Sequence, residues 1–121
     1  MDLIRKIQKS LIDYYEYKSW KNFVDNQELG ECQGIISYIK YEFPQVTTVF
    51  GEIKVDEPYI DEDGEEQILM THHWVKFRGE IYDFSKGSLS RYIEWGDIYE
   101  VNDGMDDWRY FGIRRKGRKN G

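Results

Sequence analysis

The residues that could do chemistry in this chain are few. Its 121 residues contain one cysteine, Cys32, and two adjacent histidines, His72 and His73. A thiolate is a strong nucleophile and an imidazole can carry its proton, so such a pair can attack an acyl carbon. One cysteine excludes an intrachain disulfide or a multi-cysteine zinc site, and adjacent histidines on a strand point apart. We therefore expect thiol chemistry with no metal and no organic cofactor.

Cys32 lies where a helix is expected to begin. The apolar residues after it recur at helical spacing: Ile35, Ile36, Ile39 and Phe43. Pro44 ends the pattern, so the predicted helix runs from about Cys32 to Glu42. Gly30 permits a tight turn before it, and the amides of the first turn would favour a thiolate and bind an oxyanion.

His72 lies on a predicted strand that a tight turn at Arg78-Gly79 joins to the next strand. If this turn has two residues, Asp83 is opposite Trp74 and shares a face with His72. The two would then be diagonal neighbours, close enough for a hydrogen bond that fixes the tautomer and stabilises the charged ring. A three-residue turn would bring His73 to Asp83 instead, so we favour His72 and keep His73 as the alternative.

The rest of the chain predicts the elements that position these residues. Residues 2 to about 25 have helical periodicity, with Asp2 as N-cap and a break at Lys18-Ser19. Further elements are predicted as strands at 46–55 (with Gly51 as a bulge or a point of close approach), 67–77, 80–84, 98–101 and 108–113, and a helical turn at Leu89-Tyr92-Ile93. Helices followed by hairpin-linked strands imply an α+β fold in which N-terminal helices pack on a small antiparallel sheet.

An acidic segment separates the first two strands. Residues 56–66 hold seven carboxylates, and Asp63-Gly64 is a typical two-residue hairpin turn. An EF-hand would need glycine at position six and glutamate at position twelve, and no starting residue gives both. We therefore expect a hairpin here and no metal site.

Composition and charge limit the function classes. The net charge of −6 argues against a generic nucleic-acid binder. No apolar run approaches a membrane span and no signal peptide is recognisable, so we expect a cytoplasmic protein. Six basic residues follow from Arg109 onward, so residues 1–113 are expected to form one domain and 114–121 a basic tail. The tail would balance charge or contact an anion or a partner.

The order of these motifs resembles the transglutaminase-like branch of the papain-like cysteine enzymes. The matching features are Gly30-Glu31-Cys32 before a helix, a strand from Val46 to Gly51, the strand His72-His73-Trp74, and Asp83 after a hairpin. The resemblance covers residues 26–86. It implies a papain-like core with Cys32 as nucleophile, His72 as general base and acid, and Asp83 as orienting carboxylate.

The resemblance also implies an amide side chain upstream of the cysteine as oxyanion donor, here Asn26 or Gln27. The implied activity is cysteine-dependent acyl transfer on a protein or peptide. Hydrolysis, deamidation and transamidation share this machinery and stay open, as does the oligomeric state. The alternative is a catalytically inactive papain-like protein that binds or inhibits a partner. Trp74 is expected in the core, and Trp95 and Trp108 are candidates for a cleft wall.

Overall fold

The computed structural model of the chain describes residues 2–89 and 110–112. Three helices come first, α1 (Leu3–Tyr15), α2 (Trp20–Asp25) and α3 (Cys32–Glu42). They are followed by β1 (Thr47–Ile60), β2 (Glu66–Phe77), β3 (Glu80–Tyr82), the 3₁₀ helix η1 (Lys86–Leu89) and β4 (Tyr110–Gly112). The strands pair antiparallel in the order β3-β2-β1-β4. The α+β class with an antiparallel sheet is thus confirmed.

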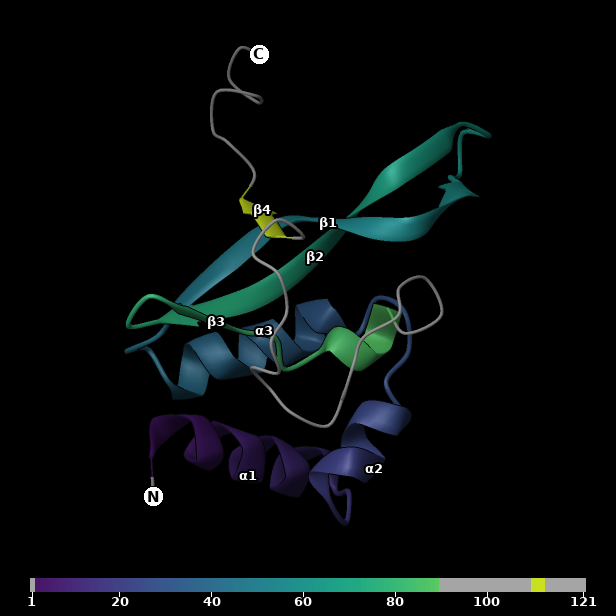
Figure 1. Cartoon of the computed structure of the whole chain (residues 1–121). Helices are drawn as coiled ribbons and strands as arrows, with labels where there is room; N and C mark the ends of the chain where they lie inside the picture. The colour runs from purple at the N-terminus through teal and green to yellow at the C-terminus, as the bar shows by residue number, and fades with distance from the viewer. Residues whose placement is uncertain (1, 90–109, 113–121) are drawn as a thin grey trace.

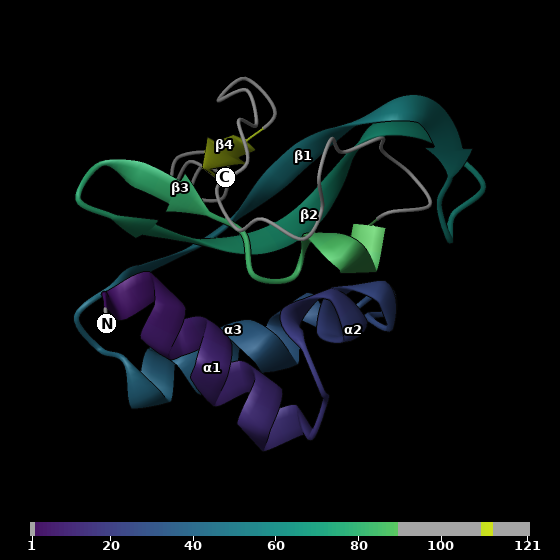
Figure 2. The same cartoon turned by 60° about the horizontal axis from the view of Figure 1, so that its bottom comes forward.

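The elements form layers below the sheet. α3 and η1 lie directly under the strands, and α1 and α2 lie under α3 and η1 (Figures 1 and 2). One core cluster joins α1, α3 and β2 through Ile7, Leu11, Ile35, Ile39 and Val75. A second cluster joins the sheet to η1 and includes Trp74, which is 1% exposed, so its predicted core position is confirmed.

The N-terminal helices begin where the sequence places caps. The Asp2 side chain accepts a hydrogen bond from the Arg5 amide at 2.9 Å. The Ser19 hydroxyl accepts from the Asn22 amide at 3.1 Å, which starts α2. The predicted break at Lys18-Ser19 is confirmed: α1 ends at Tyr15, where Glu16 takes a left-handed φ of 62°, and α2 begins after Ser19.

The β1–β2 hairpin has a longer loop than predicted. The Gly64 amide donates to the Asp61 carbonyl at 3.0 Å, so the loop is Glu62-Asp63-Gly64 rather than a two-residue turn. The reason is the Asp61 carboxylate, which accepts from the amides of Asp63 and Glu65 at 2.9 Å each. Gly64 takes a φ of 82°, a left-handed conformation that suits glycine.

The predicted bulge at Gly51 is wrong, and the strand is longer than predicted. Gly51 pairs with His72 in an unbroken ladder, and the irregularity lies between Lys54 and Tyr59. This stretch contains Pro58, which has no amide hydrogen to donate to the ladder. β1 resumes pairing beyond it and reaches Ile60.

β3 ends at Tyr82, two residues before its predicted end. The Asp83 carboxylate accepts a hydrogen bond from the Ser85 amide at 3.0 Å, and this local bond turns the chain out of the sheet. β4 falls within the strand predicted at 108–113. η1 at Lys86–Leu89 was not predicted, and the helical turn predicted at Leu89-Tyr92-Ile93 lies, apart from Leu89, outside the described residues. Other predictions lie outside the described residues: the strand at 98–101, Trp95, Trp108 and the tail at 114–121.

Candidate active site

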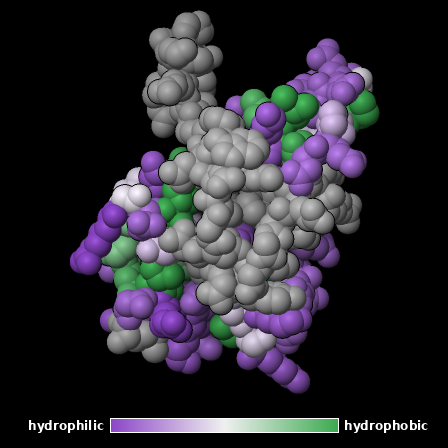
Figure 3. Space-filling view, in the orientation of Figure 1, coloured by the Kyte–Doolittle hydropathy of each residue, from purple (hydrophilic) through white to green (hydrophobic). Residues whose placement is uncertain are grey.

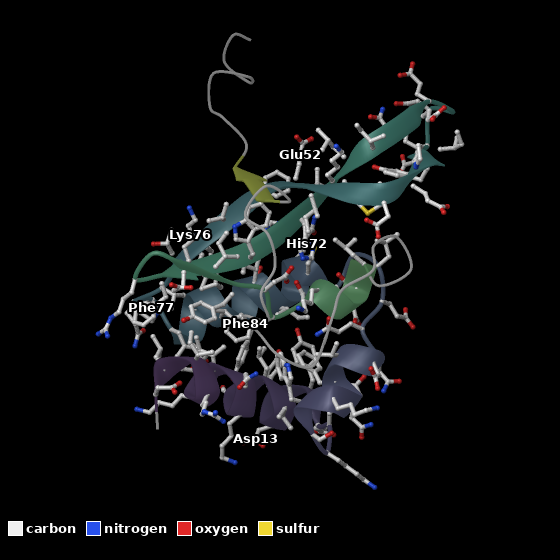
Figure 4. All side chains as sticks on the ribbon, viewed as in Figure 1. Asp13, Glu52, His72, Lys76, Phe77 and Phe84 are labelled. Atoms are coloured by element: carbon white, nitrogen blue, oxygen red, sulfur yellow. The ribbon has the colours of Figure 1, made fainter. Side chains whose placement is uncertain are left out.

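The β2–β3 hairpin brings His72 to Asp83. Arg78 and Gly79 have φ of 54° and 82°, which fits a two-residue turn of the hairpin type, and Phe77 pairs with Glu80. The predicted register is therefore confirmed. The Nε2 atom of His72 lies 3.0 and 2.9 Å from the two carboxylate oxygens of Asp83. Both side chains are fully buried, and Figure 4 places His72 between the sheet and the layer of α3 and η1.

Asp83 is itself held by the segment that follows it. The Ser85 amide donates to Asp83 Oδ1 at 3.0 Å and the Ser85 hydroxyl donates at 3.4 Å. The Ser88 hydroxyl in turn donates to the Ser85 carbonyl at 2.7 Å. Sequence reasoning missed this support. The signal was an aspartate two residues before Ser85, because an aspartate side chain often accepts from the amide two residues on.

Cys32 is the first residue of α3. The turn before it is closed by a 3.0 Å bond from the Glu31 amide to the Glu28 carbonyl, with Gly30 at a φ of 95°. Glu31 gives α3 no side-chain cap, because its carboxylate accepts from the Glu28 amide instead. First-turn amides lack a carbonyl partner within their helix. Of these, the Gln33 and Ile35 amides donate to the Gly30 and Glu31 carbonyls at 3.4 and 3.1 Å. The start of α3 still presents the positive end of the helix dipole to a negative charge near Cys32.

The charge state of His72 follows from its neighbours. Burial alone would lower its pKa, but the charge and hydrogen bond of Asp83, followed by the effect of the nearby Cys32, raise the pKa to about 9. His72 is therefore an imidazolium at neutral pH. Nε2 is used by Asp83, and within residues 2–89 and 110–112 the other ring nitrogen, Nδ1, makes no hydrogen bond of standard geometry. Nδ1 is the atom left to exchange a proton with Cys32.

His73, the alternative partner of Asp83, is placed differently. Its ring stacks on Phe50 with 4.7 Å between centroids, and it lines the same cavity as Cys32. Partial burial and the charge of neighbouring His72 lower its pKa, so it is neutral at neutral pH. The structure thus brings His72, and not His73, to Asp83.

The two candidate oxyanion donors are engaged elsewhere. Asn26 donates through Nδ2 to the Asn22 carbonyl at 2.8 Å, at the end of α2. Gln27 is buried and donates through Nε2 to the Phe84 carbonyl at 3.0 Å. Neither is among the described residues that line the cavity at Cys32. The Gln27 bond instead ties the segment before Cys32 to the residue after Asp83.

Gly87 completes this tie between the two halves of the site. A Cβ atom there would lie 2.3 Å from the Val24 carbonyl oxygen and 2.8 Å from Gln27 Oε1. Only glycine permits this approach of η1 to the end of α2. We call these contacts among Gln27, Phe84, Gly87 and Val24 the clasp. Nothing in the sequence next to Gly87 indicates a partner some sixty residues earlier.

A cavity of about 520 Å³ opens beside Cys32. It extends from the start of α3 to the end of the β1–β2 hairpin, and the described residues that line it include His73 and Asp61. In the part of the chain that the structure describes, no three His, Cys, Asp or Glu side chains are grouped as metal ligands. None of its helices has the length and hydrophobicity that a membrane crossing requires.

Comparisons with known proteins identify no relative. None of the protein-family models, curated proteins or solved structures compared with the chain matches it. The site itself combines a thiol at a helix start, a buried imidazolium near it, and a carboxylate bonded to the imidazole ring.

Proposed function

We propose that this chain is a cysteine-dependent acyl-transfer enzyme with a papain-like core and a Cys32–His72–Asp83 triad. One observation carries the proposal. His72 is completely buried, binds Asp83 through Nε2, and keeps Nδ1 unbonded within the described residues while Cys32 contributes to its raised pKa. A purely structural histidine at this depth would be expected to use both ring nitrogens.

In the first step the Cys32 thiolate attacks the carbonyl carbon of an amide. An imidazolium beside a sulfur favours the thiolate, and the first-turn amides of α3 stabilise the oxyanion that develops. His72 then gives its Nδ1 proton to the leaving nitrogen. The carbon–nitrogen bond breaks, an amine leaves, and an acyl thioester remains on Cys32.

In the second step His72, now neutral, accepts a proton from water at Nδ1. The resulting hydroxide attacks the thioester carbon, the carbon–sulfur bond breaks, and a carboxylic acid leaves. Asp83 holds the ring through Nε2 throughout and balances its positive charge. The same machinery deamidates a carboxamide or, with an amine in place of water, transfers the acyl group.

The reactivity of the only thiol tests the proposal directly. Since the chain has one cysteine, alkylation by iodoacetamide reports on Cys32 alone. At pH 6 we expect the rate to exceed that of free cysteine at least about tenfold, because free thiols are almost entirely protonated there. His72→Ala should remove the excess. The adjacent His73→Ala is the matched control and should keep it.

The opposite result would favour the catalytically inactive binding protein. That result is slow alkylation of the folded chain, similar to free cysteine and equal in all three proteins. Circular dichroism at pH 6 checks that each variant is folded. If His72→Ala does not fold, His72→Gln replaces it, since glutamine keeps hydrogen-bonding capacity toward Asp83 without the titratable ring.

A further inference from the structure

The cavity beside Cys32 has a wall that the proposed mechanism does not use. Its far side is the loop of the β1–β2 hairpin, which contributes Asp61, Glu62 and Asp63. Figure 3 shows this end of the hairpin, at the upper right, as mainly hydrophilic surface with hydrophobic residues next to it. Cys32, 7% exposed, lines the same cavity.

The described residues that line the cavity include three carboxylates: Asp61, Glu62 and Asp63. Among the described residues that line it there is no lysine or arginine, and His73 is neutral at neutral pH because its pKa is lowered. Asp61 is occupied by hydrogen bonds from the Asp63 and Glu65 amides and from Gln67. The Glu62 and Asp63 side chains are exposed, so they are the carboxylates free to meet a ligand.

Apolar side chains line the same cavity as the thiol and these carboxylates. Leu29 and Phe50, 52% and 47% exposed, line the cavity, and so does buried Met70. A complementary group therefore combines an aliphatic stem with a positive end. Lysine and arginine side chains have this form, since their methylene stems cover apolar surface while the charged head stays with water and carboxylates.

We infer that the acyl donor of this enzyme is a basic peptide or protein segment, with a lysine or arginine side chain in the cavity next to the amide that Cys32 attacks. The inference rests on the proposed function and adds its substrate class. It assigns Glu62 and Asp63 to specificity: they contact the cationic head, while Cys32 and His72 perform the chemistry.

The same charges favour a donor over an amine acceptor. An amine attacks a thioester only through its free lone pair, so it must be deprotonated. Carboxylates beside an ammonium stabilise the protonated form and raise its pKa. The cationic group bound at Glu62 and Asp63 is therefore held as a recognition element, and water is the expected acceptor.

Peptide chloromethyl ketones test this inference on the full chain. The Cys32 sulfur displaces chloride, so a carbon–sulfur bond forms as the carbon–chlorine bond breaks, and the rate needs no knowledge of the natural substrate. We compare probes with lysine, norleucine or glutamate next to the reactive carbon; norleucine is the neutral equivalent of lysine. We expect lysine to react about fivefold to tenfold faster than norleucine, and glutamate to react more slowly than norleucine.

Two double variants locate the effect. Glu62→Gln with Asp63→Asn should reduce the lysine-to-norleucine ratio to about one or two. Glu65→Gln with Glu66→Gln is the matched control: it removes the same charge from exposed positions that do not line the cavity, and it should keep the ratio. Added sodium chloride should also lower the ratio in the unaltered chain.

The outcomes separate this inference from the proposed function. Equal rates for the three probes, together with fast iodoacetamide alkylation that depends on His72, overturn the substrate class and leave the acyl-transfer function standing. A lysine preference that survives the Glu62 and Asp63 changes also overturns it. Slow reaction with every reagent, unchanged by His72→Ala, overturns both.

Discussion

Two aspartates of this chain make the same local bond in very different surroundings. Asp83 accepts a hydrogen bond from the amide of Ser85, and Asp61 accepts one from the amide of Asp63, each two residues further on. Asp83 is buried and also binds His72. Asp61 closes the exposed loop of the β1–β2 hairpin.

The comparison separates what a bond does from what burial does. At Asp61 water can replace any lost partner, so the local bond only biases the loop toward one conformation. Asp83 is 1% exposed, so bulk solvent does not reach it, and the loss of either charge leaves the other buried and unpaired. The same motif is thus a turn signal at the hairpin and a structural requirement at the site.

The largest expected effect is that of Asp83→Ala. It should lower the free energy of unfolding by about 3–5 kcal/mol, because His72 would be left charged or unsatisfied in the core. Asp63→Ala, on the exposed hairpin loop, should change it by less than about 0.5 kcal/mol. Urea denaturation at pH 7 measures both. Similar losses in the two variants would contradict the contrast between the regions.

The pH dependence of stability should come from His72. Its pKa is raised from the ordinary 6.5 to about 9 in the folded chain. The stability it contributes is therefore complete below about pH 6.5 and is lost as the pH rises through about 9, because the folded state holds the proton more tightly.

This shift corresponds to a loss of about 3 kcal/mol in the free energy of unfolding between pH 6.5 and 9.5. Urea denaturation across that range should show the decline in the unaltered chain and a flatter profile in His72→Gln. Parallel profiles would mean that other groups cause the decline. His73→Gln serves as the comparison, because the pKa of His73 is lowered and its contribution has the opposite sign.

The clasp should show a smaller effect. Gly87→Ala places a Cβ atom 2.3 Å from the Val24 carbonyl oxygen, so the backbone must move, at a cost of about 1–3 kcal/mol. Gly34→Ala is the control. Gly34 lies inside α3, and a Cβ atom there would be 3.6 Å from the Tyr15 hydroxyl, an ordinary contact distance. It should stabilise the chain by up to about 1 kcal/mol. Thermal denaturation of both variants decides; a neutral Gly87→Ala would contradict the close approach.

The sequence was sufficient for the parts of the site that depend on local rules. The glycine in Arg78-Gly79 favours a two-residue turn, and the turn's parity alone places His72 beside Asp83. The apolar positions at helical spacing begin one turn after Cys32, so they place Cys32 at the start of α3. Each inference needs only a few neighbouring residues.

The parts that could not be predicted depend on distant contacts or on competition between local bonds. Gln27 donates a hydrogen bond to the carbonyl of Phe84, which is 57 residues away in the chain. No local pattern indicates this bond, and Gln27 was therefore predicted as an oxyanion donor. At the hairpin, Asp63-Gly64 favours a two-residue turn, but Asp61 captures two amides and lengthens the loop. There, the hydrogen bonds of the Asp61 side chain to nearby backbone amides outweigh the preference of Asp63-Gly64 for a two-residue turn.

The smallest effect should be seen at Asp61 itself. Hydrogen bonds from the Glu65 amide and from Gln67 hold its pKa below the ordinary 3.8. A depressed pKa means that the bond stabilises the loop above that range and is lost as the pH falls through the folded value. Amide chemical shifts of Asp63 and Glu65, followed by NMR from pH 6 to 2, should therefore titrate with a midpoint below 3.8.

Asp61→Asn should abolish that titration, and Gln67→Ala should raise its midpoint because one donor is removed. A midpoint at or above 3.8 in the unaltered chain would mean that the exposed bonds exert no net bias on the carboxyl group. The expected small shift, beside the large cost of removing Asp83, would show that burial, and not the shared amide bond, makes one aspartate indispensable to the fold.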